Sequence, residues 1–414
     1  MLPSILHLSH FDEYGGSARS ARNIHTGLRE LGIRSRMLVG RKEGDDPDVR
    51  RIASSRAIAF ADRAAHRLAD EAGLQYVANA SSFLLRRHPW FREADVLQLF
   101  NIHGGWFALT ALPLVTRAKP TVWRLSDMWA MTGHCGYSLD SERWRTGCGS
   151  CPHLDTYPAV RRDATSLNWR LKRRVYARAP LTLVAPTRWL EQLTRESPLL
   201  AHYPVRVIPN GVEDVFLAPL DGANARASLG LPDRPVVLVA SLEQRKGGLL
   251  LEETLSRVAA ELPLTVLVMG ARGVPVPAVP GGTVRDLGVL DDQEQIRRAY
   301  AAADVLLHPS LADNLPNAIL EGMAAGLPVV ALRAGGVSDA VDDGTNGYLA
   351  ERPDPRLLSA RLLTILRDPE ARQRMGDAAR ATILGGFTSM RQARAFASLY
   401  EEILGDGECR PVRA

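Results

Sequence analysis

The sequence predicts an α/β protein built from two doubly wound domains, each a parallel sheet covered by helices. Two observations lead to this fold class. The chain has 414 residues, which is more than one ordinary hydrophobic core takes, so two domains are expected. Short apolar segments also alternate with helical patterns in both halves of the chain, and such alternation is typical of parallel sheets.

The short apolar segments of both halves supply the predicted strands. They are separated by segments with a helical pattern, such as residues 17–31, 248–261 and 293–302. The predicted strands are residues 5–10, 36–39, 96–100, 122–125 and 181–185 in the first half, and 235–241, 264–269, 305–308 and 329–332 in the second.

A Pro-Asn-Gly turn within VRVIPNGVEDVF (205–216) marks the predicted join between the domains. We therefore expect a first domain over residues 1–207 and a second over 208–388. An amphipathic helix over 389–405 is expected to pack across both domains, and residues 406–414 to form a flexible tail. Ligands of doubly wound domains bind outside the carboxyl ends of the strands, so two facing domains predict a ligand in an interdomain cleft.

The composition is that of an ordinary soluble protein, with 46% hydrophobic and 23% charged residues. No apolar stretch reaches the roughly 18 residues that span a bilayer, and the first ten residues resemble a strand rather than a signal peptide. Four cysteines over this length do not make a disulfide scaffold, so we expect a cytoplasmic protein. The net charge of +5 is modest, and no nucleic-acid partner is expected.

A run of basic residues lies in the first half, and two interpretations of it stay open. It could touch anionic lipid headgroups at the inner membrane face, or an anionic acceptor. Alternatively, it is the solvated face of a helix. The residues are Arg161, Arg162, Arg170, Lys172, Arg173, Arg174 and Arg178.

The most informative segment is PSLADNLPNAILEGMAAGLPVVA, residues 309–331. It places Asp313 in a polar loop and Glu321 in a short helix, which Asn314 is expected to cap and Gly326 to end. A helix N-terminus attracts phosphate, and carboxylates accept hydrogen bonds from sugar hydroxyl groups. The segment therefore suits a sugar nucleotide, with a surface turn before an ordinary helix as the alternative.

Two further loops follow predicted strands and could face the same ligand. Gly15 and Gly16 precede a helix, and paired glycines let a backbone approach a phosphate closely. Arg245 and Lys246 lie at a strand-to-helix turn, where they suit a diphosphate leaving group. Taken singly, a tight turn and an exposed basic turn explain these residues equally well. The three loops together favour a nucleotide site.

These motifs resemble those of the large glycosyltransferase family 4, whose members have the GT-B fold of two Rossmann-like domains facing a cleft. The sequence is especially similar to members for exopolysaccharide or colanic-acid assembly. Those carry two glutamates separated by seven residues, and here Asp313 takes the first place and Glu321 the second. The motifs that carry the resemblance are YGGSARSA, FNIHGG, RLSDMWAMTGHCGY, IPNGV, RKGG, DNLPN, GMAAGLPVV and GGVSDAVDDGTNGYL.

The resemblance implies that the donor is a nucleoside diphosphate sugar, and it assigns residues to the diphosphate. Lys246, and with it Arg245, would neutralise the departing diphosphate. The backbone of Gly16, next to Gly15, would reach the same group from the facing domain.

The resemblance also assigns residues to the sugar and the ribose of the donor. Asp313 would bind hydroxyl groups of the transferred sugar, helped by backbone N–H groups of Asn314 and Leu315. Glu321 would hold the ribose hydroxyl groups. The implied mechanism is front-face displacement with retention, in which the leaving phosphate helps to deprotonate the acceptor. No metal or other cofactor is then obligatory, because positioning and electrostatic stabilisation supply the catalysis.

Several positions depart from the family pattern, including the following three. Ser126 stands where many relatives have a histidine before the aspartate of DMW, and Phe100 replaces the first histidine of HNIHGG. Asp313 is about one methylene shorter than the usual glutamate. These changes put the identity of the donor in question and leave room for an inactive relative.

His103 and Asp127 are candidate contacts for the acceptor or the donor sugar, and we count Asp127 among the catalytic residues. His103 follows a predicted strand and precedes two glycines, and Asp127 stands in the RLSDMW segment. A buried structural histidine and a cap of the following segment are the alternatives.

Cys135, Cys148 and Cys151 lie close together in the sequence, with His134 beside the first of them. Relatives often have a fourth cysteine where this chain has Ser141, which suggests a small zinc-like clip in them. The set is incomplete here, so we favour reduced thiols without a metal over a clip completed by a histidine.

The predicted function is that of a retaining hexosyltransferase, which moves a sugar from a UDP- or GDP-linked donor to a carbohydrate acceptor. Exopolysaccharide or cell-surface glycan assembly is the expected process, and a lipid-linked oligosaccharide at the inner membrane face the expected acceptor. Two alternatives stay open: a GT-B sugar-nucleotide epimerase, and a non-catalytic relative that binds sugar nucleotides.

Overall fold

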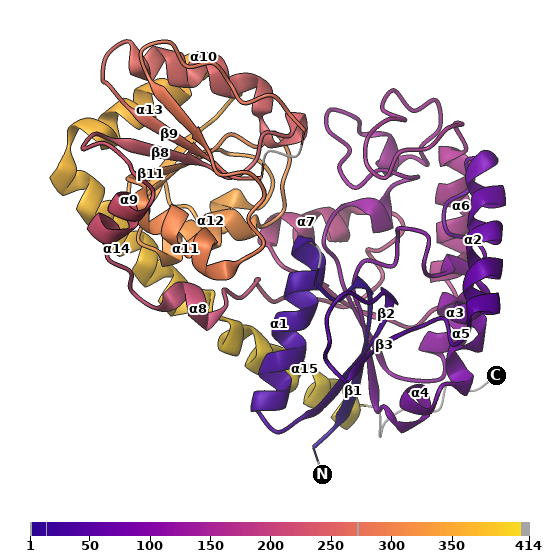
Figure 1. Ribbon diagram of the computed structural model, residues 1–414. Helices are drawn as coiled ribbons and strands as arrows, with labels where there is room; N and C mark the ends of the chain where they lie inside the picture. Colours follow the sequence, from indigo (N-terminus) through magenta and orange to yellow (C-terminus); the bar gives the residue numbers. More distant parts are fainter. Residues whose placement is uncertain (1, 14, 271–272, 407–414) are drawn as a thin grey trace. The chain divides into compact units, whose positions relative to one another are not determined.

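The computed structural model describes residues 2–13, 15–270 and 273–406 (Figure 1). The described residues fall into two compact units. One is drawn from Met1–Pro209 together with Ser389–Ala414, and the other from Asn210–Thr388. In the described parts of the chain we find no helix with the length and apolarity that crossing a membrane requires.

The first unit is built on a parallel sheet whose seven strands, among the described residues, follow the order β3-β2-β1-β4-β5-β6-β7. The strands are β1 (Ser4–Phe11), β2 (Arg34–Arg41), β3 (Val49–Arg51), β4 (Val96–Leu99), β5 (Thr121–Arg124), β6 (Thr182–Ala185) and β7 (Val205–Val207). Neighbouring residues of β1 belong to different hydrophobic clusters. Leu6 and Leu8 belong to one cluster, and Ile5 belongs to another. The sheet is therefore covered on both faces, as parallel sheets require.

The helices of the first unit come from both ends of the chain. They are α1 (Gly16–Glu30), α2 (Arg56–Glu71), α3 (Ala80–Leu84), α4 (Pro89–Glu93), α5 (Leu112–Thr116), α6 (Thr165–Tyr176), α7 (Arg188–Glu196) and α15 (Ser389–Asp406). Helix α15 packs against α1 (Figure 1). A Cβ atom on Gly27 would lie 2.6 Å from the Cβ of Ala393, so glycine at this position permits the close approach of the two helices.

The helix expected over residues 389–405 is thus α15, a part of the first unit. Its predicted contact with the second domain stays a prediction. Of the predicted tail, residues 407–414 lie outside the described residues.

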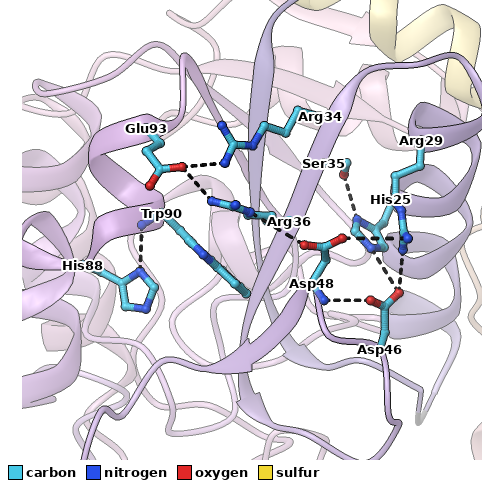
Figure 2. A network of polar contacts seen from close by, with 10 residues as sticks. All are labelled: His25, Arg29, Arg34, Ser35, Arg36, Asp46, Asp48, His88, Trp90 and Glu93. Carbon is cyan, nitrogen blue, oxygen red and sulfur yellow. Dashed lines mark hydrogen bonds and ion pairs between the residues drawn. The ribbon is translucent and has the colours of Figure 1, made fainter.

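A polar network fastens β2 to the helices beside it (Figure 2). Arg36 donates a hydrogen bond of 2.8 Å to Glu93 of α4, and its guanidinium lies 4.9 Å from the centre of the Trp90 ring. The preceding residue, Ser35, places its Oγ 2.8 Å from Nδ1 of His25 in α1. Adjacent residues of one strand therefore reach opposite faces of the sheet, as the pleat dictates.

The second unit repeats this plan. Among the described residues, its six parallel strands follow the order β10-β9-β8-β11-β12-β13. They are β8 (Val236–Val239), β9 (Thr265–Val268), β10 (Thr283–Asp286), β11 (Val305–His308), β12 (Val329–Leu332) and β13 (Gly347–Ala350). Val236 and Leu238 enter one hydrophobic cluster, and Val237 and Val239 enter another, so this sheet is also covered on both faces.

Seven helices accompany the second sheet in the described residues. They are α8 (Asp214–Leu217), α9 (Gly222–Ser228), α10 (Gly248–Ala259), α11 (Gln293–Ala302), α12 (Asn317–Ala324), α13 (Pro355–Arg367) and α14 (Pro369–Gly386).

Both sheets share a feature that defines doubly wound folds. In the first, the chain builds β1, β2 and β3 outward and then returns to place β4 on the other side of β1. In the second, β8, β9 and β10 run outward and β11 returns beside β8. The predicted class, two doubly wound α/β domains, is confirmed. Each sheet has a switch point where ligands of such folds bind, between β1 and β4 and between β8 and β11.

Candidate active site

The switch point of the second sheet brings together the two residues that the sequence placed in separate loops. Lys246 ends a short 3₁₀ turn, Gln244–Lys246, after β8, and Asp313 lies in the loop after β11. The two side chains form an ion pair. His308, the last residue of β11, places its Nε2 3.5 Å from Oδ2 of Asp313. A cation, a carboxylate and an imidazole therefore meet at the carboxyl edge of the sheet.

Electrostatics keep this carboxylate ionised. Asp313 is buried, and burial alone would raise its pKa. The Lys246 ammonium and the His308 side chain outweigh burial, so the pKa of Asp313 lies below its ordinary value. The second oxygen, Oδ1, accepts a hydrogen bond of 3.1 Å from the backbone N–H of Asn314. Burial lowers the pKa of His308, which makes the neutral imidazole its form at neutral pH.

Two glycines allow the surrounding loops to pack this closely. Gly247 has φ +83°, and a Cβ atom there would lie 1.9 Å from the carbonyl oxygen of Pro309. Gly335 has φ +60°, and its Cβ would lie 1.7 Å from the carbonyl oxygen of Asp313. Both positions therefore exclude any side chain. Arg245 completes the link, because its Nη1 donates to the carbonyl of Ala312 at 2.6 Å.

Glu321 lies on α12, the helix that follows the Asp313 loop. It is buried, and its Oε2 accepts a hydrogen bond of 3.1 Å from the hydroxyl of Tyr300 in α11. The predicted cap by Asn314 is wrong. The helix begins at Asn317 with Pro316 as its N-cap and no side-chain cap hydrogen bond, so Asn314 stands too far before the first turn to cap it. Gly326 follows the helix end with φ +84°, as predicted for a helix stop.

Leu315 is buried just before α12, and its carbonyl oxygen accepts a hydrogen bond of 3.1 Å from Nδ2 of Asn210. Asn210 belongs to the IPNGV motif. The hydrogen bond therefore fixes the loop that carries Asp313 and Asn314 to the beginning of the second unit. Sequence reasoning gave Asn210 only a role in a turn.

The first unit carries its candidate residues at the corresponding switch point. Gly15, with φ +88°, is the N-cap of α1, and Gly16 is the first residue of that helix. A Cβ on Gly15 would meet no described atom within 4 Å. The backbone conformation, and not crowding by neighbouring side chains, therefore calls for glycine there.

His103 and Asp127 follow the adjacent strands β4 and β5 and contact each other. Nε2 of His103 lies 3.1 Å from Oδ2 of Asp127, and Oδ1 accepts a hydrogen bond of 2.9 Å from the backbone N–H of Trp129. Both residues are buried. Tyr157, whose ring lies 5.8 Å from that of His103, is 62% exposed. The pair therefore lies beneath an exposed aromatic side chain that sequence reasoning missed.

Two further groups near this switch point were also missed. Arg124 ends β5, is buried, and donates a hydrogen bond of 3.0 Å to Oγ of Ser126. Ser126 in turn donates at 3.1 Å to Oγ of Ser17 in the first turn of α1. Burial lowers the pKa of Arg124 to about 10. The serine that departs from the family pattern thus connects a buried guanidinium to the α1 N-terminus.

Two family descriptions match the chain, one on each half. "Glycosyltransferase Family 4" matches residues 14–215, and "Glycosyl transferases group 1" matches residues 233–368. The chain belongs to the family 4 glycosyltransferases. The predicted family is confirmed.

Individual relatives of this glycosyltransferase are moderately similar. The putative colanic acid biosynthesis glycosyl transferase WcaC of Escherichia coli is 25% identical over 342 residues, which are 77% of this chain and 80% of that protein. A D-inositol 3-phosphate glycosyltransferase of Segniliparus rotundus is 30% identical over 223 residues, and the match spans only 49% of that protein's length. The crystal structure of Anabaena Alr3699/HepE in complex with UDP-glucose matches with a TM-score of 0.63 at 18% identity. The match covers 97% of this chain and 100% of that chain.

The cysteines of this glycosyltransferase are free thiols in the described residues, where Cys135, Cys148 and Cys151 line one pocket with His134. Nε2 of His134 lies 3.4 Å from Sγ of Cys151, and Sγ of Cys148 accepts a hydrogen bond of 3.1 Å from the Gly133 N–H. The described residues contain no group of three histidine, cysteine or acidic side chains arranged to hold a metal ion. The arrangement therefore gives no support to the metal clip.

Lys172 corrects the interpretation of the basic run as one solvated or lipid-facing surface. It is buried, donates a hydrogen bond of 2.9 Å to the carbonyl of Thr132, and lies 3.6 Å from the centre of the Trp129 ring. Burial lowers the pKa of Lys172 to about 7. The Lys172 amino group thus holds the backbone just before Cys135. Arg170 and Arg174 of the same helix are exposed.

Proposed function

We propose that this glycosyltransferase transfers a hexose from a nucleoside diphosphate sugar to a glycan acceptor, with retention at the anomeric carbon, in exopolysaccharide or cell-surface glycan assembly. The observation that carries the donor part is the meeting of Lys246 and Asp313 at the switch point of the second sheet. A cation there suits a diphosphate, and a carboxylate suits sugar hydroxyl groups. Alr3699/HepE, described in complex with UDP-glucose, supports a donor of this class.

The reaction follows from these groups. The bond between the anomeric carbon and the diphosphate oxygen breaks while the acceptor oxygen bonds to the same face of that carbon. The acceptor proton passes to the leaving phosphate oxygen. Lys246 stabilises the charge that develops on the diphosphate, and Glu321 holds the ribose. The protein then needs no metal of its own for this step, because the ammonium group supplies the positive charge.

The acceptor is assigned to the first unit. The His103–Asp127 pair offers a hydrogen-bonding site, and the exposed Tyr157 ring beside it offers a flat apolar surface on which a sugar ring can pack. The name of WcaC, a putative colanic acid biosynthesis glycosyl transferase, supports a glycan acceptor. A lipid-linked oligosaccharide is the acceptor class that we favour.

We also propose peripheral contact with the inner face of an anionic membrane, through a surface formed by α2 and α6. Phe60 and Leu68 of α2 are 68% and 76% exposed. Asn168 of α6 donates a hydrogen bond of 2.9 Å to the carbonyl of Gly73, just after α2, so the two helices are neighbours. Apolar side chains next to arginines are the combination that binds anionic lipid interfaces. The exposed arginines are Arg56, Arg63 and Arg67 of α2 and Arg170, Arg173 and Arg174 of α6.

A ligand screen followed by product analysis tests the donor and the stereochemistry. Thermal unfolding is measured with UDP, GDP and a panel of their sugar conjugates. A ligand at one hundred times its dissociation constant should stabilise the protein by about 2.7 kcal/mol. The identified donor is then incubated with candidate acceptors, and the anomeric configuration of the product is determined by NMR. An inverted product would exclude the proposed mechanism.

A non-catalytic, donor-binding role is the second candidate, and the departures at Phe100, Ser126 and Asp313 are what favour it. Stabilisation by a sugar nucleotide without release of free nucleoside diphosphate, whatever the acceptor, would support that role. Release of nucleoside diphosphate would also exclude the epimerase alternative, because an epimerase returns a sugar nucleotide.

A further inference from the structure

The two residues assigned to different parts of the donor are bound to each other in the structure. In the proposed function Lys246 binds the diphosphate and Asp313 binds the transferred sugar. In the structure the Lys246 ammonium is already neutralised by the Asp313 carboxylate. A donor therefore finds its binding cation occupied.

We propose that donor binding exchanges this ion pair, and that His308 is the positioning residue that makes the exchange possible. The diphosphate replaces Asp313 as the ion-pair partner of Lys246. The released Asp313 carboxylate then accepts hydrogen bonds from the hydroxyl groups of the sugar. His308 touches Asp313 and not the donor. The inference rests on the proposed function and deepens it by naming how the site distinguishes a sugar nucleotide from a free nucleoside diphosphate.

His308 matters because a buried carboxylate that loses its cation is costly unless other donors remain. Oδ2 of Asp313 faces both Lys246 and His308, and Oδ1 is held by the Asn314 N–H. Nε2 of His308 lies 3.5 Å from Oδ2, so it stays within reach of the carboxylate when Lys246 turns to the diphosphate. The charged groups that face His308 are Asp313, Lys246 and Arg245.

The exchange has a direct consequence for selectivity. A free nucleoside diphosphate must break the Lys246–Asp313 pair but offers the carboxylate no sugar hydroxyl groups in return. A sugar nucleotide breaks the same pair and supplies them. The pair therefore weakens binding of the by-product more than binding of the donor, which favours release of nucleoside diphosphate after transfer.

Titration calorimetry on the full chain tests the exchange, with UDP, UDP-glucose, GDP and GDP-mannose as ligands. Asp313→Asn should bind the free nucleoside diphosphate roughly three- to tenfold more tightly, because the competing carboxylate is gone. The same variant should bind the sugar nucleotide no more tightly, or more weakly. Opposite changes of the two affinities are not expected from a general loss of structure.

A double-mutant cycle separates exchange from long-range charge. In a Lys246→Met background, Asp313→Asn should no longer tighten nucleoside diphosphate binding. An equal gain in that background would overturn the exchange. Asp304→Asn is the matched control, since Asp304 is similarly buried and pairs with Arg226 at 2.7 Å just before β11, at the opposite edge of the sheet. It should leave both affinities unchanged.

Variants of His308 test its positioning role. His308→Leu should weaken binding of both ligands several-fold, and His308→Gln, whose side-chain amide can donate to Asp313, should restore most of the loss. Equal effects of Leu and Gln would overturn the role of His308. Weaker binding of both ligands by Asp313→Asn would overturn the exchange alone. If the unaltered protein binds none of the four ligands, the proposed function itself fails, and the inference with it.

Discussion

His103 and Asp127 form a buried pair at the carboxyl edge of the first sheet, with 3.1 Å between Nε2 and Oδ2. They follow adjacent strands, β4 and β5, so the sheet itself sets their separation. The second aspartate oxygen is held by the Trp129 N–H. The carboxylate therefore fixes which nitrogen of the imidazole carries the proton.

Asp127→Asn should impair acceptor use without altering donor binding. The amide keeps the size of the side chain but can present an N–H to Nε2, which favours the other imidazole tautomer. We expect kcat/KM for the acceptor to fall on the order of a hundredfold while the donor dissociation constant stays unchanged. Steady-state kinetics with acceptor varied, and donor calorimetry, measure the two effects. His66→Gln is the control, because His66 lies beside Gly105 in the same region. A comparable loss of kcat/KM in His66→Gln would show that the effect of Asp127→Asn comes from disturbed packing in this region.

Glu321→Ala should weaken donor binding while the protein stays folded. A hydrogen bond to a charged group contributes roughly 1.5–3 kcal/mol, so the affinity should fall about ten- to a hundredfold. Tyr300→Phe removes the hydrogen bond to Oε2 and keeps the carboxylate, so its effect should be smaller. Calorimetry with the identified donor gives both values. Survival of activity and donor affinity in Glu321→Ala would show that the ribose assignment is wrong.

Gly335→Ala should abolish activity through the backbone alone. The added Cβ would lie 1.7 Å from the carbonyl oxygen of Asp313 at a residue with φ +60°, so the loop that carries the carboxylate has to move. We expect donor binding to be lost and stability to fall by about 2–4 kcal/mol. Gly344→Ala is matched to it, because Gly344 has φ +81° and open space around its Cβ position. That control should cost about 1 kcal/mol and retain activity. Urea unfolding and donor titration of both variants decide the matter.

Phe60→Ser combined with Leu68→Ser should reduce binding to anionic vesicles. Burying either side chain contributes roughly 1.5–3 kcal/mol, so partial insertion of two should change the vesicle affinity about tenfold or more. Cosedimentation with phosphatidylglycerol-containing and phosphatidylcholine-only vesicles measures it. Leu384→Ser on α14 is the control, since Leu384 is 48% exposed. Unchanged vesicle binding by the double variant would show that α2 is not part of the membrane-binding surface.

The strands that are buried throughout could be predicted from the sequence, and several strands at the sheet edges could not. Residues 96–100 and 305–308 were predicted because their strands, β4 and β11, are buried throughout. The edge strands β3, β10 and β13 were missed. Val49–Arg51 has one buried residue and Thr283–Asp286 has none, so neither carries an apolar run.

The positions of Lys246 and Asp313 could be predicted, but their ion pair could not. They stand 67 residues apart, and only the strand order, which places β11 beside β8, brings them together. The burial of Lys172 could not be predicted from the sequence either. A lysine within a run of arginines suggests a solvated surface, and only the packing of α6 on Trp129 shows otherwise. Whether the candidate residues act as assigned stays a prediction.

Because helix α15 belongs to the first unit, that unit is complete only when the C-terminal end of the chain has been synthesised. Phe396 and Tyr400 of this helix are buried in the same cluster as Ile5 and Ile24, yet they leave the ribosome about 370 residues or more after those partners. The second unit, continuous from Asn210 to Thr388, can complete its own core before the first is finished. During translation the unit that begins first is therefore expected to fold last, and its unfinished sheet to be the surface that chaperones meet.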